Sequence, residues 1–208
     1  MKKTERAAKV LKRLERGYGT PAWGRGGPFK TLVATILSTQ CTDRQVDKVL
    51  PTLFKKFRTP RDFANADLRT LEKMMRSTGY YHQKAKHLKA MARKLVSDYG
   101  GRVPASMAEL VKLPGVGRKT ANIVLSQGFG KTEGIAVDTH VWRLSRRLGF
   151  SKKNTQLGIE RDLMALFEKK DWGKVNELLV QHGRAVCTAR KPECCACAVR
   201  QWCPSREC

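Results

Sequence analysis

The feature of this sequence that most constrains its fold is the segment from Leu113 to Ala121, which reads LPGVGRKTA and lies between two stretches with helical spacing. Pro114 disfavours the α-helical conformation at Leu113, so a preceding helix should end there. Gly115 and Gly117 permit backbone angles and close approaches that a Cβ would block. The segment therefore predicts two helices joined by a tight hairpin, over about residues 106–126.

The second helix of this hairpin would begin with backbone N–H groups that have no partner within the helix, and such an end binds anions. The chain carries 42 Lys and Arg against 18 Asp and Glu, a formal charge of +24. A basic surface of this kind supplies affinity for polyanions that does not depend on sequence. The anion we expect is a DNA phosphate. A membrane surface is the alternative, but no stretch approaches the ~20 apolar residues that span a bilayer.

Lys119 lies in the predicted first turn of that second helix. The positive end of the helix dipole disfavours an ammonium there, and so does the neighbouring charge of Arg118. Both effects favour a neutral, nucleophilic amine. The alternative is a surface lysine on a phosphate-binding turn.

Apolar residues follow helical spacing along almost the whole chain, which predicts an all-α protein. A basic amphipathic helix is expected over residues 4–17, and a long helix is expected to end near residue 99. Two possible capping boxes, Thr42 with Gln45 and Ser106 with Glu109, predict helix starts. Asp138 is well placed to cap a further helix, and no alternating strand pattern is found.

Six of the seven cysteines lie between Cys187 and Cys208. An odd total crowded at the C-terminal end argues against a secreted disulfide framework and favours metal or cluster ligation. Six, two and five residues separate the members of the set Cys187, Cys194, Cys197 and Cys203. Four thiolates can hold either one zinc ion or a [4Fe–4S] cluster. Cys195 competes with Cys194 as a ligand, and we prefer Cys194 because it gives the two-residue step to Cys197.

Two basic residues, Arg190 and Lys191, fall between the first two of these cysteines. A segment fixed by a metal centre would hold them toward a phosphate backbone. The alternative is a solvated run of charge.

Three features now stand together: the hairpin with Lys119, the segment Val137–Val141 that reads VDTHV, and the spacing of the four cysteines. In this order and at these separations they resemble the endonuclease III family, of the helix-hairpin-helix base-excision DNA glycosylase superfamily. The resemblance extends from about residue 37 to Cys203.

The resemblance implies two helical lobes. A six-helix barrel with the helix-hairpin-helix would span residues 22–132, and residues 1–21 with 133–208 would form the other lobe. That lobe would carry a [4Fe–4S] cluster on the four cysteines, so by resemblance we choose iron–sulfur over zinc. The lesion pocket would lie between the lobes.

The resemblance also implies a bifunctional DNA glycosylase and AP lyase of base excision repair, which removes oxidised pyrimidines through a lysine Schiff base and cleaves 3′ of the abasic site by β-elimination. Lys119 would be the nucleophile, because relatives that only remove adenine or mismatched thymine carry a different residue there. Asp138 would stabilise positive charge on the sugar, a role compatible with capping a helix.

Further positions of the resemblance concern DNA. Gln40 would fill the space left by the flipped nucleotide, and Tyr80 falls where the family often inserts an aliphatic wedge. A helix-end polar residue, ordinary loop packing and a structural histidine are the alternatives for Gln40, Tyr80 and His140. We expect the DNA contacts to come from Gln40, Tyr80, Leu113, Gly115, Val116, Gly117, Arg118, His140, Arg190 and Lys191.

The expected partner is damaged double-stranded DNA, with no membrane partner. We expect a monomer in the cytoplasm, associated with the nucleoid. Two other functions are consistent with part of these sequence features. One is a non-catalytic DNA-binding or redox-sensing module, which needs no lysine nucleophile, and the other is a zinc-stabilised structural protein.

Overall fold

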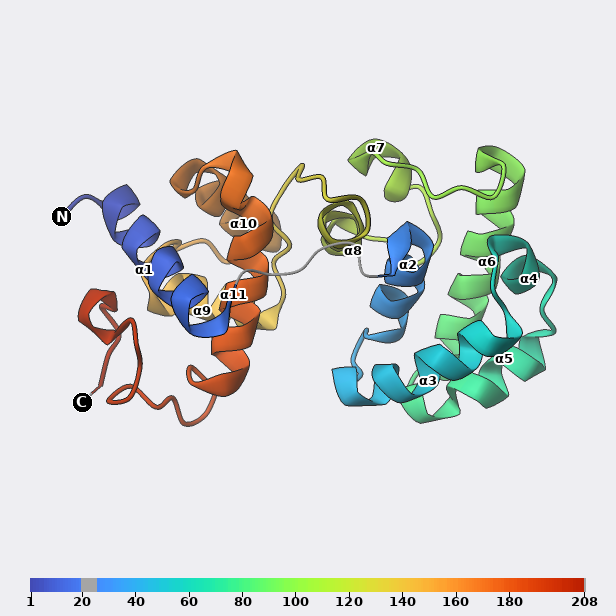
Figure 1. The fold of residues 1–208 in the computed structure, drawn as a ribbon, viewed down its shortest axis with the longest axis horizontal. Coiled ribbons are helices and arrows are strands. Elements are labelled where there is room, and N and C mark those ends of the chain that lie inside the picture. Colours follow the sequence, from blue (N-terminus) through green and yellow to red (C-terminus); the bar gives the residue numbers. More distant parts are fainter. Residues whose placement is uncertain (20–25, 208) are drawn as a thin grey trace. The chain divides into compact units, whose positions relative to one another are not determined.

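The computed structural model describes residues 1–19 and 26–207, and within them every regular element is a helix or a helical turn (Figure 1). The expectation of an all-α fold is confirmed. The described chain divides into two compact units. Residues 26–131 form the central unit, and residues 1–19 with 132–207 form the terminal unit. The expected lobes of residues 22–132 and 1–21 with 133–208 stay a prediction, and their boundary between 21 and 22 lies outside the described residues.

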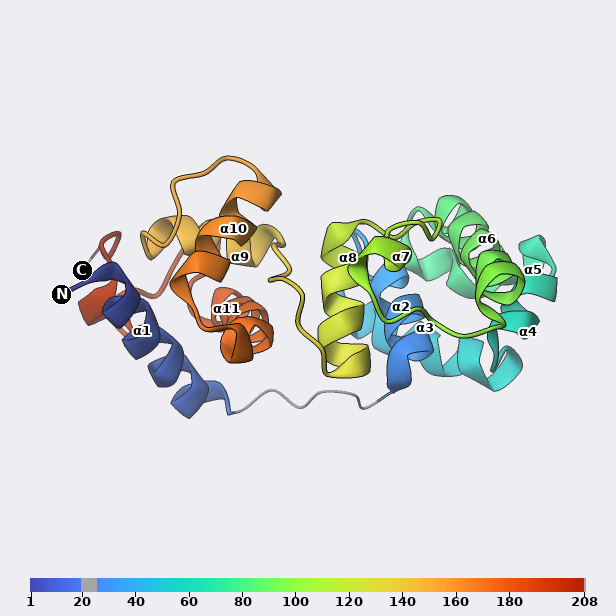
Figure 2. The ribbon, with the colours of Figure 1, turned by 90° about the horizontal axis from the view of Figure 1, so that it is seen from above.

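The central unit is built around one long helix, α6 (Tyr81–Tyr99), which packs against α4 and α5 (Figure 2). Ala85, Leu88, Met91, Ala92 and Leu95 on α6 are all fully buried, as their helical spacing predicts. The other elements of this unit are α2 (Gly27–Leu37), α3 (Asp43–Lys56), α4 (Pro60–Asn65), α5 (Leu68–Met75), α7 (Met107–Leu110) and α8 (Arg118–Ile123).

Two short turns complete the central unit. A 3₁₀ turn at Arg76–Thr78 joins α5 to the start of α6. A π-helical turn at Val124–Gly128 extends α8 and packs against α2. At this contact Gly128 is required, because a Cβ there would lie 2.9 Å from the Cα of Pro28.

The terminal unit packs the first helix of the chain against the last (Figure 1). Its helices are α1 (Lys3–Tyr18), α9 (Thr139–Arg147), α10 (Gln156–Leu166) and α11 (Trp172–Ala185). Short 3₁₀ turns lie at Lys169–Asp171 and Arg200–Trp202. Helix α1 buries Ala7, Val10, Leu11 and Leu14, the apolar stripe expected from the sequence.

Both predicted capping boxes are wrong, although helices begin at both positions. Thr42 precedes α3 without a side-chain cap, because Gln45 donates instead to Ser77 Oγ at 2.6 Å. Ser106 precedes α7, but its hydroxyl donates directly to the Glu109 carboxylate at 2.8 Å. In each case a polar side-chain group that the capping box requires, the Gln45 amide or the Ser106 hydroxyl, is hydrogen-bonded to another side chain instead.

None of the described helices is both long enough and apolar enough to cross a membrane.

Candidate functional site

The predicted hairpin is present in the central unit, between α7 and α8. Helix α7 ends at Leu110, three residues earlier than Pro114 alone would require, and Val111 to Gly117 form the turn. Leu113 and Val116 fix this turn to the protein core, with 2% and 6% of their surface exposed. The Val116 amide donates to the Leu113 carbonyl at 3.1 Å. These two apolar residues therefore position the turn, and their buried side chains do not face solvent.

The two glycines of the hairpin have different reasons for being glycine. Gly115 has a left-handed φ of 77°, and a Cβ there would lie 2.9 Å from the Cβ of His87 on α6. Gly117 has an extended φ of −91° and no atom within 4 Å of the position of its missing Cβ. Gly115 is thus required by the fold, whereas Gly117 leaves an open approach to the backbone at the start of α8.

Arg118 and Lys119 occupy the first turn of α8. Arg118 is exposed and Lys119 is half-buried. Within residues 1–19 and 26–207, no carboxylate forms an ion pair with the amine of Lys119. Lys119 therefore lies in the first turn of α8, as the sequence predicts.

Asp138 caps α9 in the terminal unit, as predicted. Its Oδ1 accepts hydrogen bonds from the backbone amides of His140 and Val141 at 2.9 and 2.8 Å. Its Oδ2 forms no hydrogen bond with any other described group, and the side chain is half-buried. One oxygen can therefore cap the helix while the other faces a ligand. Lys119 belongs to the central unit and Asp138 to the terminal unit.

His140 is tied into the terminal unit rather than free at its surface. Arg143 on the same helix donates to His140 Nδ1 at 3.2 Å and to the Gly183 carbonyl at 2.8 Å. Burial lowers the pKa of His140, and the charge of Arg143 lowers it further, against the opposite effect of Asp138. A neutral imidazole is thus favoured beside the cap of α9.

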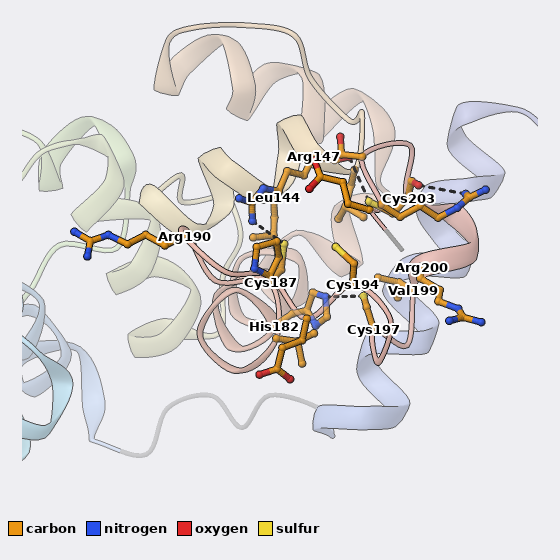
Figure 3. Close-up of a pocket in the computed structure, with 17 residues that line it drawn as sticks. Leu144, Arg147, His182, Cys187, Arg190, Cys194, Cys197, Val199, Arg200 and Cys203 are labelled. Carbon is orange, nitrogen blue, oxygen red and sulfur yellow. Dashed lines mark hydrogen bonds between the residues drawn. The ribbon is translucent and has the colours of Figure 1, made fainter.

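The four predicted cysteines converge in the terminal unit. Cys187, Cys194, Cys197 and Cys203 all line one cavity of about 210 Å³ (Figure 3). Burial raises the pKa of the thiols of Cys197 and Cys203, and the other cysteines raise it further because their charges would repel. Cys195 is exposed and does not line the cavity, which supports the choice of Cys194. Cys208 lies outside the described residues.

This donor set is compatible with an iron–sulfur cluster. Four thiols around a shared cavity match the four thiolate ligands of a [4Fe–4S] cluster. The cavity wall combines apolar residues such as Leu144 and Val199 with charged residues such as Arg147 and Arg200.

Polar groups that the sequence analysis missed surround these thiols. His182 Nε2 lies 3.4 Å from Cys197 Sγ (Figure 3). The hydroxyl of Tyr18 contacts the other ring nitrogen, Nδ1, at 3.0 Å. Burial lowers the pKa of His182 to about 4, so its imidazole is neutral at pH 7. Arg147 donates to Cys187 Sγ at 3.3 Å. The sequence offers one indication that His182 lies near the cysteines, because only five positions separate it from Cys187. A histidine buried in the core would show the same spacing.

Arg190 and Lys191 are both exposed on the segment between the first two cysteines. Arg190 lies at the rim of the cavity, and its side chain points away from the thiols (Figure 3). Arg147 fixes this segment by donating to the carbonyls of Thr188 and Ala189 at 2.7 and 2.9 Å. The two cations are therefore held outward on a fixed backbone.

Gln40 and Tyr80 share an unusual backbone conformation in the central unit. They are the two non-glycine residues with positive φ in the described chain, at 49° and 48°. Gln40 is exposed, and Tyr80 exposes 70% of its surface. Left-handed backbone at exposed residues is uncommon outside functional sites, and neither residue packs into the core.

Comparisons with known proteins show the family of this chain. Residues 33–169 match the HhH-GPD family, described as HhH-GPD superfamily base excision DNA repair protein. Endonuclease III of Synechocystis sp. is 45% identical over 207 residues, covering 99% of this chain and 94% of the relative. Endonuclease III of Bacillus subtilis is 45% identical over 177 residues, covering 85% and 80%.

Solved structures give the same result. A trapped endonuclease III–DNA covalent intermediate superposes with a TM-score of 0.91 at 38% identity, covering 99% of this chain and 97% of that chain. A thermostable thymine-DNA glycosylase superposes with a TM-score of 0.87 at 25% identity, covering 97% of each chain. The chain therefore belongs to the endonuclease III family, within the HhH-GPD superfamily of base excision DNA repair proteins.

Proposed function

We propose that this protein is a bifunctional DNA glycosylase and AP lyase that removes oxidised pyrimidines from double-stranded DNA. The observation that carries the proposal is the half-buried amine of Lys119, which begins α8 directly after the glycine hairpin and pairs with no described carboxylate. A relative that is 38% identical has been trapped as a covalent intermediate with DNA, which supports a nucleophile in this family.

The chemistry follows from an amine and a carboxylate. An oxidised pyrimidine is flipped out of the duplex, and Lys119 Nζ attacks C1′ of its deoxyribose while the base leaves. The covalent product becomes a Schiff base, and loss of a C2′ proton then expels the 3′ phosphate by β-elimination. Covalent catalysis of this kind divides one difficult step into two easier ones.

Asp138 contributes the negative charge. Its Oδ2, which no described group occupies, would stabilise positive charge as it develops on the sugar. Its Oδ1 already accepts two backbone hydrogen bonds, so the carboxylate is held in a fixed orientation before substrate binds. A fixed charge needs no reorganisation during the reaction, which is the source of its catalytic effect.

The hairpin would bind the DNA strand. The open approach at Gly117 lets a phosphate reach the first amides of α8, and exposed Arg118 adds charge beside it. Leu113 and Val116 are buried, so their part would be to hold the turn. Gly115 would do the same by packing on His87.

Gln40 would fill the space that the flipped nucleotide leaves, and Tyr80 would insert into the base stack. Both combine exposure with left-handed backbone, and strained positions of this kind gather at ligand-binding sites. The aromatic ring of Tyr80 can stack on a base, an interaction worth about 1–3 kcal/mol in single-strand binders.

A [4Fe–4S] cluster would be held by Cys187, Cys194, Cys197 and Cys203. When bound, it would join the end of α11 to the C-terminal segment through four iron–thiolate bonds. Arg190 and Lys191 would then lie on a rigid loop and contact phosphates, which fix register without reading sequence. His140 would line the pocket beside Asp138.

Borohydride trapping on duplex DNA with one abasic site tests the proposal. Wild-type protein should form a covalent adduct, and Lys119→Gln should form none. Lys112→Gln is the matched control, because Lys112 is an exposed lysine on the hairpin turn that precedes α8. An adduct that persists unchanged in Lys119→Gln would show that another amine is the nucleophile and would refute the assignment to Lys119, whereas a wild-type protein that forms no adduct would leave only a non-catalytic DNA-binding module.

Asp138→Asn separates the two functions of that side chain. The amide oxygen can still cap α9, so the fold should persist while base removal slows. A monomeric state and association with the nucleoid, both expected from the sequence, stay predictions.

A further inference from the structure

Lys84 is a buried lysine in the central unit, with 4% of its surface exposed. Burial lowers the pKa of its amine. No described carboxylate pairs with it, and its Nζ donates to one carbonyl, that of Thr78, at 2.7 Å. A buried amine with no acid opposite it is costly, and its position near the N-terminus of α6 adds to that cost. A methionine would fill the same space more cheaply, so the amine calls for a separate explanation.

The carbonyl that Lys84 binds lies directly before the turn that carries Tyr80. Gly79 and Tyr80 both have left-handed φ values, of 66° and 48°. The side chain of Lys84 binds the Thr78 carbonyl, and its backbone amide binds the Tyr80 carbonyl at 3.1 Å. One residue therefore holds both peptide carbonyls that flank the left-handed pair.

The conformation of Tyr80 needs this external support. A tyrosine disfavours left-handed backbone, because its Cβ then crowds the carbonyl oxygen. Its ring exposes 70% of its surface, so burial in the core does not compensate for the strain. The preceding turn is closed separately, by the Thr78 hydroxyl on the Met75 carbonyl at 2.8 Å. Lys84 is thus the side chain that connects this turn to the buried face of α6.

A side-chain hydrogen bond also links the segment that follows Gln40 to the turn that precedes Tyr80. Gln45 Nε2 donates to Ser77 Oγ at 2.6 Å, which links the start of α3 to the 3₁₀ turn before Tyr80.

We propose that Lys84 is a positioning residue that holds Tyr80 in the conformation that inserts into the base stack of damaged DNA. The inference rests on the proposed function, and it assigns to Lys84 a role that acts only through Tyr80. Without the bond to the Thr78 carbonyl, the left-handed pair would relax toward commoner backbone angles. The ring would then have to be reordered whenever DNA binds, which would weaken insertion.

Binding to a non-reactive abasic analogue tests this proposal without any chemical step. The duplex carries a tetrahydrofuran site with 2-aminopurine as its neighbour, and 2-aminopurine becomes more fluorescent when it is unstacked. The preference for this duplex over an undamaged one is measured for wild type, Lys84→Met, Tyr80→Ala and the double variant. Lys86→Met is the matched control, because it removes the same charge from an exposed site on α6.

Lys84→Met should lower the preference by about tenfold, the loss expected for one hydrogen bond from a charged donor, and it should also lower the fluorescence rise. Tyr80→Ala should show a loss at least as large, and adding Lys84→Met to it should change nothing further. Lys86→Met should retain the wild-type preference. This non-additivity is the signature of a residue that acts through Tyr80.

Three results would overturn the proposal. Lys84→Met could match wild type, the two losses could multiply in the double variant, or wild type could fail to unstack 2-aminopurine. Circular dichroism checks folding, and Lys84→Leu, which also lacks a donor, replaces Lys84→Met if that variant unfolds. Lys119→Gln keeps the insertion signal and loses borohydride trapping, so failure of the catalytic proposal is distinguishable from failure of this one.

Discussion

The two glycines of the hairpin offer the sharpest test of how this site is built, because one is required by the fold and the other is not. Gly115→Ala and Gly117→Ala add the same methyl group two residues apart. At Gly115 the methyl meets a left-handed φ of 77° and the Cβ of His87 at 2.9 Å. At Gly117 it meets no atom within 4 Å. The two variants should therefore fail in different assays.

The magnitudes follow from these contacts. Left-handed backbone costs alanine about 1–2 kcal/mol, and overpacking costs about 1–3 kcal/mol. Gly115→Ala should thus lower the free energy of unfolding by about 2–5 kcal/mol, and lower the Tm by about 4–20 °C in a chain of this size. For Gly117→Ala, a gain of about 0.4–1 kcal/mol from the unfolded state offsets the poorer helix cap, so the Tm should barely change.

DNA affinity should show the opposite order. If a phosphate approaches the α8 amides past Gly117, a methyl there blocks a charge-assisted hydrogen bond worth about 1.5–3 kcal/mol. The Kd for an abasic-analogue duplex should then rise by about 10- to 150-fold in Gly117→Ala. Thermal unfolding and fluorescence anisotropy at one fixed salt concentration measure the two effects. A Gly117→Ala protein that loses stability and keeps its DNA affinity would refute this reading of the hairpin.

Three further predictions concern the rest of the chain. Cys194→Ser should abolish the absorbance near 400 nm of a [4Fe–4S] centre, whereas Cys195→Ser, outside the cavity, should retain it; equal loss in both would contradict the ligand assignment. Because the pKa of His140 is lowered from 6.5 in the folded state, the unfolded chain binds more protons as the pH falls below 6.5, and stability should fall. Chemical denaturation of wild type and His140→Gln from pH 7.5 to 5 should show that the variant has lost part of this dependence. The net charge of +24 predicts that DNA affinity falls steeply and log-linearly with salt, and a flat salt titration would exclude phosphate binding as its main source.

Much of the fold could be predicted from the sequence because the signals were local. The stripe of α1 and the buried face of α6 follow from helical spacing alone. The cap at Asp138 needed only an aspartate before an apolar helix. The four cysteines could be assigned to one centre because their spacing is short, and they do line one cavity.

Other features could not be predicted because their partners are distant in the sequence. Gln45 was expected to cap its own helix, but Ser77, thirty-two residues away, takes its amide instead. The contact of Tyr18 with His182 joins residues 164 positions apart. The burial of Lys84 could not be predicted either, because a lysine on an amphipathic helix ordinarily lies on the solvated face.

The terminal unit suggests why a cysteine-held centre would lie in a protein whose proposed chemistry needs no electron transfer. Arg143 lies on α9, the helix that Asp138 caps, and it donates to the carbonyls of Cys187 and Gly183 at 2.9 and 2.8 Å. Gly183 allows this approach, since a Cβ there would lie 3.0 Å from Arg143 Nη2. A centre that fixes Cys187 therefore also fixes α9 and the direction of the Asp138 carboxylate. In this arrangement the cysteines act on catalysis through position, because a carboxylate stabilises a developing charge only when it is already aimed at it.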